Sequence, residues 1–96
     1  MTAKTSMNSP FVVQIQANQK CLSVSSDFAI VGAMGVFVRN LQLATGTPVT
    51  VRVCRGLDEV TLFGIVCARY ADLGLVIQFK PTTARMEQRL ATVLAA

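Results

Sequence analysis

The sequence predicts an all-β domain, a small antiparallel barrel closed by one C-terminal helix. Four β runs lie between residues 35 and 79, and short glycine-marked turns separate them. The runs are GVFV at 35–38, TPVTVRVC at 47–54, VTLFGIVCAR at 60–69 and LGLVIQF at 73–79. Short β runs at close spacing favour a barrel. A single amphipathic helical pattern then follows at the C-terminus.

The length and composition predict one domain with a short polar extension. Residues 1–9 are small and polar, so we expect a flexible N-terminal tail before a single domain at 10–96. Hydrophobic residues make up 52% of the 96 residues and charged residues 15%, against ~25% charged in a typical soluble domain. Either the core is dense, or an apolar patch is covered by a partner or a second copy.

The positive charge indicates solubility rather than a nucleic-acid partner. The formal net charge is +4, but the basic residues form no tract. They are scattered along the chain at Lys4, Lys20, Arg39, Arg52, Arg55, Arg69, Lys80, Arg85 and Arg89.

Cysteine use and the N-terminus favour a cytoplasmic protein. Cys21, Cys54 and Cys67 cannot all pair, none belongs to a C-x-x-C motif, and histidine is absent. We therefore expect no metal and no cofactor. Free thiols suit a reducing cytoplasm. The N-terminus lacks the apolar stretch of a signal peptide, and no apolar run approaches the ~20 residues that span a bilayer.

The first third of the chain predicts a hairpin and then an ambiguous apolar run. FVVQIQ at 11–16 alternates as a strand, Asn18 favours a turn, and CLSV at 21–24 is a candidate second strand. The run at 28–38 is almost wholly apolar. Its glycines disfavour a helix and indicate a bulge or a close backbone approach.

A second hairpin is predicted from the runs at 47–54 and 60–69. We expect a turn at 56–59 and Arg55 opposite Val60, which places both alternating apolar faces on the same side of the sheet. This register leaves Phe63 and Ile65 pointing outward. The alternative is that the C-terminal helix covers them.

The end of the chain predicts one more strand and the helix. LGLVIQF alternates, and Pro81 ends the sheet. Thr82 or Thr83 can cap a helix at about 82–95, and the apolar residues that would pack down are Met86, Leu90, Val93 and Leu94.

Three segments together resemble the PilZ family. They are GVFVRN at 35–40, LATGTPVTVRV at 43–53, and LFGIV at 62–66 followed by LGLVIQF at 73–79. The resemblance implies a six-stranded antiparallel β-barrel with a C-terminal helix. It also implies the family's usual function, which is binding of cyclic di-GMP through an R-x-x-x-R pair and a [D/N]-x-S-x-x-G motif.

This chain departs from both of those motifs. No arginine precedes Arg39, so the arginine pair is missing. Alignment on GVFV places Ile30, Gly32 and Gly35 at the three positions of the second motif, and only the glycine survives. A shifted alignment gives Asp27, Ala29 and Gly32, again without the serine. We therefore expect no cyclic di-GMP binding of the usual kind, because the phosphate and guanine contacts are lost.

The departure favours a protein-interaction module. Members without the nucleotide motifs are associated with type IV pilus assembly, motility and polarity, through contacts with other cytoplasmic proteins. The candidate interaction residues are Arg52, Phe63, Ile65 and Arg69, since aromatic, aliphatic and arginine side chains suit an interface centre.

Three other interpretations stay open. Non-standard arginines could bind cyclic di-GMP, from the set Arg39, Arg52, Arg55 and Arg69. Phe63 between Arg52 and Arg69 could stack a single-stranded nucleic acid. Catalysis is disfavoured, because there is no histidine and the cysteines lack a neighbouring base. The five acids are equally scattered, at Asp27, Asp58, Glu59, Asp72 and Glu87.

Overall fold

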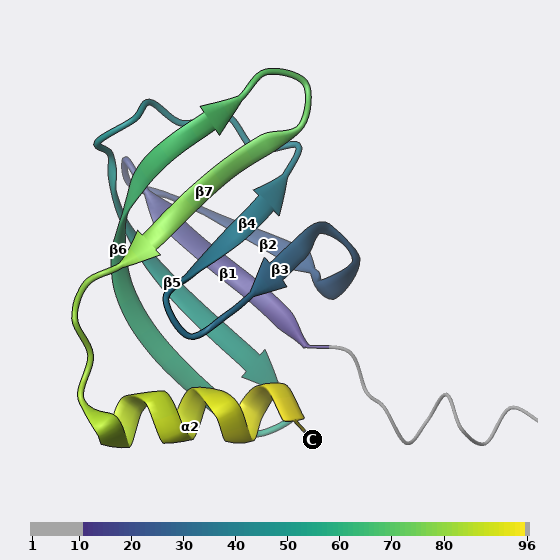
Figure 1. Cartoon of the computed structure of the whole chain (residues 1–96). Helices are drawn as coiled ribbons and strands as arrows, with labels where there is room; N and C mark the ends of the chain where they lie inside the picture. The colour runs from purple at the N-terminus through teal and green to yellow at the C-terminus, as the bar shows by residue number, and fades with distance from the viewer. Residues whose placement is uncertain (1–10, 96) are drawn as a thin grey trace, which may run out of the picture.

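The structure is a computed structural model that describes residues 11–95, and it confirms the predicted fold class. A curled antiparallel sheet carries one C-terminal helix at its end (Figure 1). The predicted N-terminal tail at 1–9 lies outside the described residues. The elements are β1 (Val12–Ala17), β2 (Lys20–Ser25), η1 (Ser26–Phe28), β3 (Ala29–Val31), β4 (Gly35–Arg39), β5 (Pro48–Arg55), β6 (Asp58–Tyr70), β7 (Gly74–Phe79) and α2 (Ala84–Ala95).

The sheet has the strand order β2-β1-β5-β6-β7-β4-β3, with every neighbouring pair antiparallel. It contains seven strands rather than six, because the apolar run at 28–38 folds into two. Residues 32–34 turn the chain, so that Ile30 pairs with Phe37. The edge strands β2 and β3 are joined by the single turn of η1.

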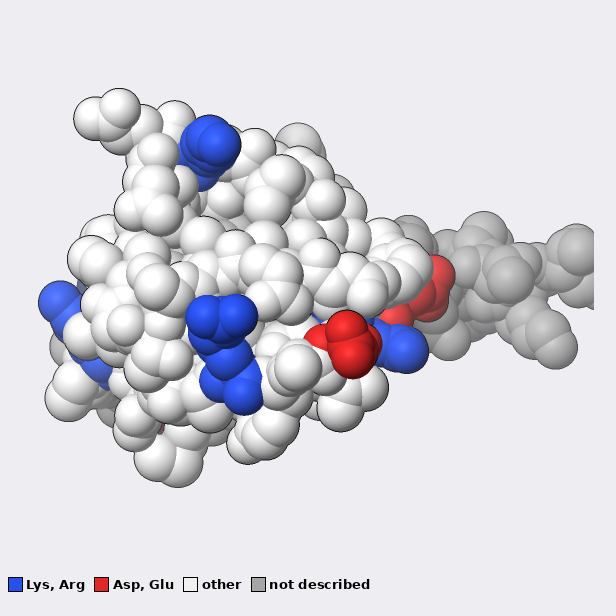
Figure 2. Space-filling model, turned by 90° about the horizontal axis from the view of Figure 1, so that it is seen from above, with Lys and Arg blue, Asp and Glu red and all other residues white. Residues whose placement is uncertain are grey.

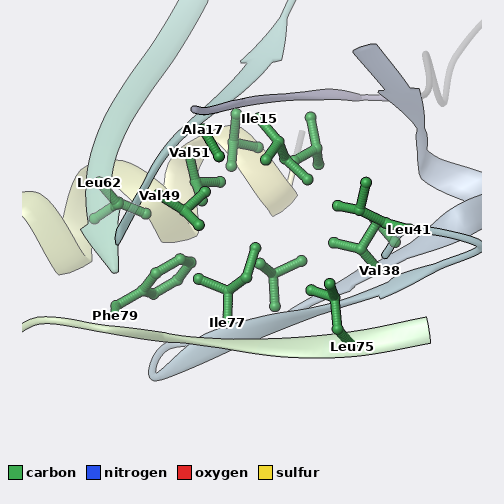
Figure 3. Close-up of a cluster of buried hydrophobic side chains, with 14 of the residues drawn as sticks. Ile15, Ala17, Val38, Leu41, Val49, Val51, Leu62, Leu75, Ile77 and Phe79 are labelled. Carbon is green, nitrogen blue, oxygen red and sulfur yellow. The ribbon is translucent and has the colours of Figure 1, made fainter. Parts of the chain in front are cut away.

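Alternation along the strands builds the core. The concave side of the curled sheet collects the aliphatic side chains, and Figure 3 shows Ile77 and Phe79 of β7 pointing across the interior toward Val49 and Val51 of β5. No polar or charged side chain of the described residues is buried. The predicted amphipathic strands therefore close on one interior made of branched aliphatic side chains, which suit a pleated surface.

The β5–β6 hairpin keeps its predicted faces but not its predicted register. The turn is the two-residue step Gly56-Leu57, and Arg55 lies opposite Asp58 rather than Val60. The expected turn at 56–59 is therefore wrong by two residues. Because side chains alternate with a period of two, a shift of two leaves the apolar face inward. Val53 meets Val60, and Val51 meets Leu62, with all four buried.

Helix α2 covers the end of the barrel beside this hairpin. Thr83 caps it, since its Oγ1 accepts a hydrogen bond from the Met86 amide at 3.2 Å. Leu90 and Val93 are buried, with Met86 and Leu94 packed partly against the core. The apolar side of the helix that the sequence predicted is therefore the side that packs against the core. No helix in residues 11–95 is long and apolar enough to cross a membrane.

Two arginines fasten α2 to the hairpin in opposite directions. Arg55 of β5 donates to the helix C-terminus, with Nε 2.7 Å from the Val93 carbonyl and Nη2 3.0 Å from the Leu94 carbonyl. Arg89 of α2 donates from Nε to the Glu59 carbonyl at 2.8 Å. A cation at a helix C-terminus also opposes the negative end of the helix dipole. The Arg55 side chain therefore holds the C-terminal end of α2 against the hairpin.

Replacing Arg55 with alanine is expected to loosen α2 from the sheet. The loss of charged hydrogen bonds to two carbonyls should lower the free energy of unfolding by about 2 kcal/mol. Urea titration followed by circular dichroism measures this. The control is Arg85→Ala on the exposed side of the same helix, which should change stability by less than about 0.5 kcal/mol. Equal stability of the two variants would contradict this role for Arg55.

Candidate functional site

The three positions of the second nucleotide motif lie on β3, the following turn and β4. Ile30 is on the convex side of the sheet, 70% exposed. Gly32 is in the turn, and its amide donates to the Gly35 carbonyl at 2.9 Å. A Cβ at Gly32 would make only an ordinary contact, 4.0 Å from the Gly35 carbonyl oxygen, whereas a Cβ at Gly35 would collide with the backbone carbonyl of Ile77.

Gly35 is thus required by strand packing. β4 approaches β7 so closely there that any side chain would push the two strands apart. Strand packing therefore explains why a glycine stands at this motif position, and no ligand contact is needed to explain it. In the shifted alignment, Asp27 lies exposed in η1 and Ala29 is buried in β3. Neither alignment provides a polar group at the serine position.

Phe63 and Ile65 lie on the convex side of β6, as the predicted faces of the hairpin required. Their exposed fractions are 56% and 40%, so α2 does not cover them, and the alternative interpretation is wrong. Arg52 lies exposed on the neighbouring strand, where Thr50 pairs with Phe63. The structure brings these three side chains to one side of the sheet.

Arg69 is separated from that group by a β-bulge. The pairing of β6 with β7 shifts between Val66 and Ala68, so that Arg69 lies opposite Leu75, a fully buried residue. An inserted residue moves every later side chain to the other face. Arg69 therefore lies at the rim of the interior, and its Nη2 donates to Gln42 Oε1 at 3.2 Å. The nucleic-acid interpretation loses one of its two flanking cations.

The convex side instead carries a larger apolar surface than the sequence indicated. Ile30 of β3 pairs with Phe37 of β4, Phe37 with Val76 of β7, and Val76 with Ala68 of β6. The Tyr70 ring lies beside that of Phe37, with centroids 6.4 Å apart. We define the outer apolar face as Ile30, Phe37, Phe63, Ile65, Tyr70 and Val76.

A shallow depression marks the middle of this face. It has a volume of about 370 Å³ and is lined by Met34, Phe37, Cys67 and Val76, with Gly35 also contributing. Met34 is 75% exposed at its border. Aromatic and aliphatic side chains around a depression are typical of the centre of a protein interface. Sequence reasoning found two members of the face and missed the rest, because long-range strand pairing brings them together.

The arginines proposed as an alternative nucleotide clamp have separate surroundings. Arg55 is bonded to the end of α2, and Arg69 to Gln42. Arg39 lines a cavity beside β2, whereas Arg52 lines a much smaller one with Gln14 and Thr61. Figure 2 shows one face of the molecule, most of which is uncharged. Acidic and basic groups lie together on the right of this view, and the other basic groups are separated by uncharged surface.

The cysteines give no sign of a reactive or metal-binding centre in the described part of the chain. Residues 11–95 contain no group of three potential metal ligands. Burial raises the pKa of the Cys54 thiol, Glu59 raises it further, and Arg52 partly offsets both. A raised pKa leaves less of the nucleophilic thiolate at neutral pH. Cys21 and Cys67 are free and exposed.

The fold and the site define a small barrel-like domain with one end-capping helix and an apolar convex side. Among solved structures, the chain is similar to one described as the "Crystal structure of PilZ domain of CeSA from cellulose synthesizing bacterium". The TM-score is 0.57, at 16% identity over 92% of this chain and 93% of that one. The chain therefore has a PilZ-like fold. No family model matches the sequence, and no curated protein matches it significantly.

The two motif glycines should respond differently to alanine. Gly35→Ala forces a methyl group into the Ile77 carbonyl, so we expect a loss of about 1–3 kcal/mol in the free energy of unfolding. Gly32→Ala creates no clash, and its free energy of unfolding should stay within about 0.5 kcal/mol of the parent's. Thermal and urea unfolding measure both. A tolerated Gly35→Ala would show that β4 and β7 are not in this close contact.

Proposed function

We propose that this chain is a non-catalytic protein-interaction module. In this proposal it regulates bacterial motility or type IV pilus function in the cytoplasm and does not bind cyclic di-GMP in the usual way. The PilZ-like fold supports the class of module. The association of motif-lacking members with pilus and motility proteins supports the process. Its partner is another cytoplasmic signalling or motility protein.

The observation that carries the proposal is the position of Ile30. In the alignment on GVFV, this residue takes the place of the polar first residue of the nucleotide motif, and it is 70% exposed in a cross-strand row with Phe37 and Val76. In that alignment, the first position of the motif belongs to the outer apolar face. Exposed apolar surface of this kind is stabilised when a partner covers it.

A charge on the outer apolar face should abolish partner binding. Tagged protein is used to capture partners from a lysate of the native host, with captured proteins quantified by mass spectrometry. Ile30→Glu and Ile65→Glu should each reduce the specific partner by about tenfold or more, because a buried carboxylate is costly at an interface. The matched control is Leu57→Glu at the tip of the β5–β6 hairpin, where the side chain is fully exposed. Retention of every partner by all three variants would contradict the proposal.

Calorimetry with cyclic di-GMP separates this proposal from its alternative. We expect no binding to the purified domain, because the R-x-x-x-R pair, whose two guanidinium groups would hold the phosphates, is missing. The alternative is a cyclic di-GMP-binding regulator that uses Arg39, Arg52, Arg55 or Arg69. Micromolar or tighter binding that Arg39→Ala or Arg52→Ala removes would establish that alternative.

A further inference from the structure

β2 is a regular edge strand with an open side. It spans six residues and pairs only with β1, in unbroken register from Ala17–Lys20 to Val12–Ser25. Edge strands usually avoid further pairing by being short, bulged or rich in charge. The opposite edge, β3, has only three residues. β2 shows no such protection beyond Lys20 at its start.

The turn before β2 determines which of its backbone groups face outward. Asn18 and Gln19 have φ values of 53° and 65° and form a two-residue hairpin turn. The flanking pair Ala17–Lys20 is therefore hydrogen bonded, and alternate residues of β2 point their amides and carbonyls away from β1. These residues are Cys21, Ser23 and Ser25. Among the backbone hydrogen bonds of residues 11–95 that lie outside helices and strands, none reaches Cys21 or Ser23. η1 begins directly after Ser25, at Ser26.

A groove runs along this open edge. A cavity of about 500 Å³ is lined on one side by the four consecutive residues from Leu22 to Ser25. Its other side is made by Phe28 and residues 39–41. A second cavity of about 430 Å³ shares Leu22 and Leu41 with the first and continues to Lys20. Leu22 and Phe28, which both line the first cavity, are 48% and 43% exposed.

The charge of the groove is positive. Arg39 lines the first cavity and has no hydrogen bond or ion pair with any described residue, and Lys20 lines the second. No carboxylate is among the lining residues of either cavity. A bound segment with an acidic side chain near Arg39 would therefore gain a charge-assisted contact.

From these observations we propose that the β2 groove binds an extended segment of a partner protein as an added strand. The segment pairs with Cys21 and Ser23, places alternate apolar side chains against Leu22, and presents an acidic residue to Arg39. Main-chain hydrogen bonds give such complexes affinity, and side-chain pockets give them specificity. The residues that line the two cavities include no member of the outer apolar face, so the test of the groove can be interpreted independently of that face.

The groove fits one strand better than a second copy of this chain. Pairing of β2 with β2 of another copy would bring β1 of that copy alongside as a continuing sheet. The wall formed by Phe28 and Arg39–Leu41 occupies that side. A lone extended segment needs only the width of a single strand, about 4.8 Å from β2.

The test uses short peptides of alternating valine and threonine with one glutamate, and the same peptides with lysine in its place. Fluorescence anisotropy gives affinities, and NMR hydrogen exchange follows the amides of Cys21 and Ser23. We expect these amides to become protected. We expect the glutamate peptides to bind about tenfold more tightly than the lysine peptides, with the preference reversed in Arg39→Glu.

Proline substitution supplies the backbone control. Ser23→Pro removes an outward amide without removing a bond to β1, so affinity should fall by about tenfold. Thr45→Pro adds a proline in the turn between Ala44 and Thr47. Thr45 lines neither cavity, so this variant should bind within about twofold of the parent. If Ser23→Pro fails to fold, the backbone control uses the peptides instead. Peptides are N-methylated either on the amides of one edge of the extended strand or on the amides of the other edge, and their affinities are compared.

Four outcomes would overturn the proposal. The first is unchanged binding by Ser23→Pro, and the second is equal affinity for glutamate and lysine peptides. The third is amide protection in the free protein that rises with concentration, which would show a second copy on β2. The fourth is protection of these amides by cyclic di-GMP but by none of the peptides.

Discussion

The close approach of neighbouring strands to β7 is the constraint on which the rest of this structure depends. Gly35 of β4 and Gly64 of β6 flank β7, and a Cβ at either position would collide with its backbone, 2.6 Å from the Gln78 carbonyl in the case of Gly64. Without side chains there, the three strands curl tightly. The curl gives the sheet a concave side that is filled with aliphatic groups and a convex side that collects Ile30, Phe37 and Val76.

Two irregularities show how the period of two governs the site. The β5–β6 register differs from the expected one by two residues, and Phe63 and Ile65 still face outward. The bulge after Val66 inserts one residue, and Arg69 changes sides. An even shift preserves which face a side chain occupies, and an odd shift reverses it. A surface predicted from alternation is therefore reliable only up to the first bulge.

The arginines illustrate why charge alone predicted little of the site. Arg55 looked equivalent to Arg52 and Arg69 in the sequence, but it holds the C-terminus of α2 across an interval of nearly forty residues. Arg39 is the arginine that lines the largest of the described cavities. A guanidinium on a strand can donate to the carbonyls at a helix end, donate to a side chain at the rim of the barrel, or line a groove. Only the positions of distant carbonyls and amides distinguish these roles.

The sequence by itself determined the all-β class, the alternating core strands, the capped C-terminal helix and the loss of the nucleotide motifs, because each follows from local periodicity or from the residue types present. The tertiary structure alone decided the curl of the sheet, the bulge that displaces Arg69, the helix clamp by Arg55 and the open edge of β2. These depend on contacts between segments far apart in the chain. Local spacing carries no information about which strand a given strand will meet.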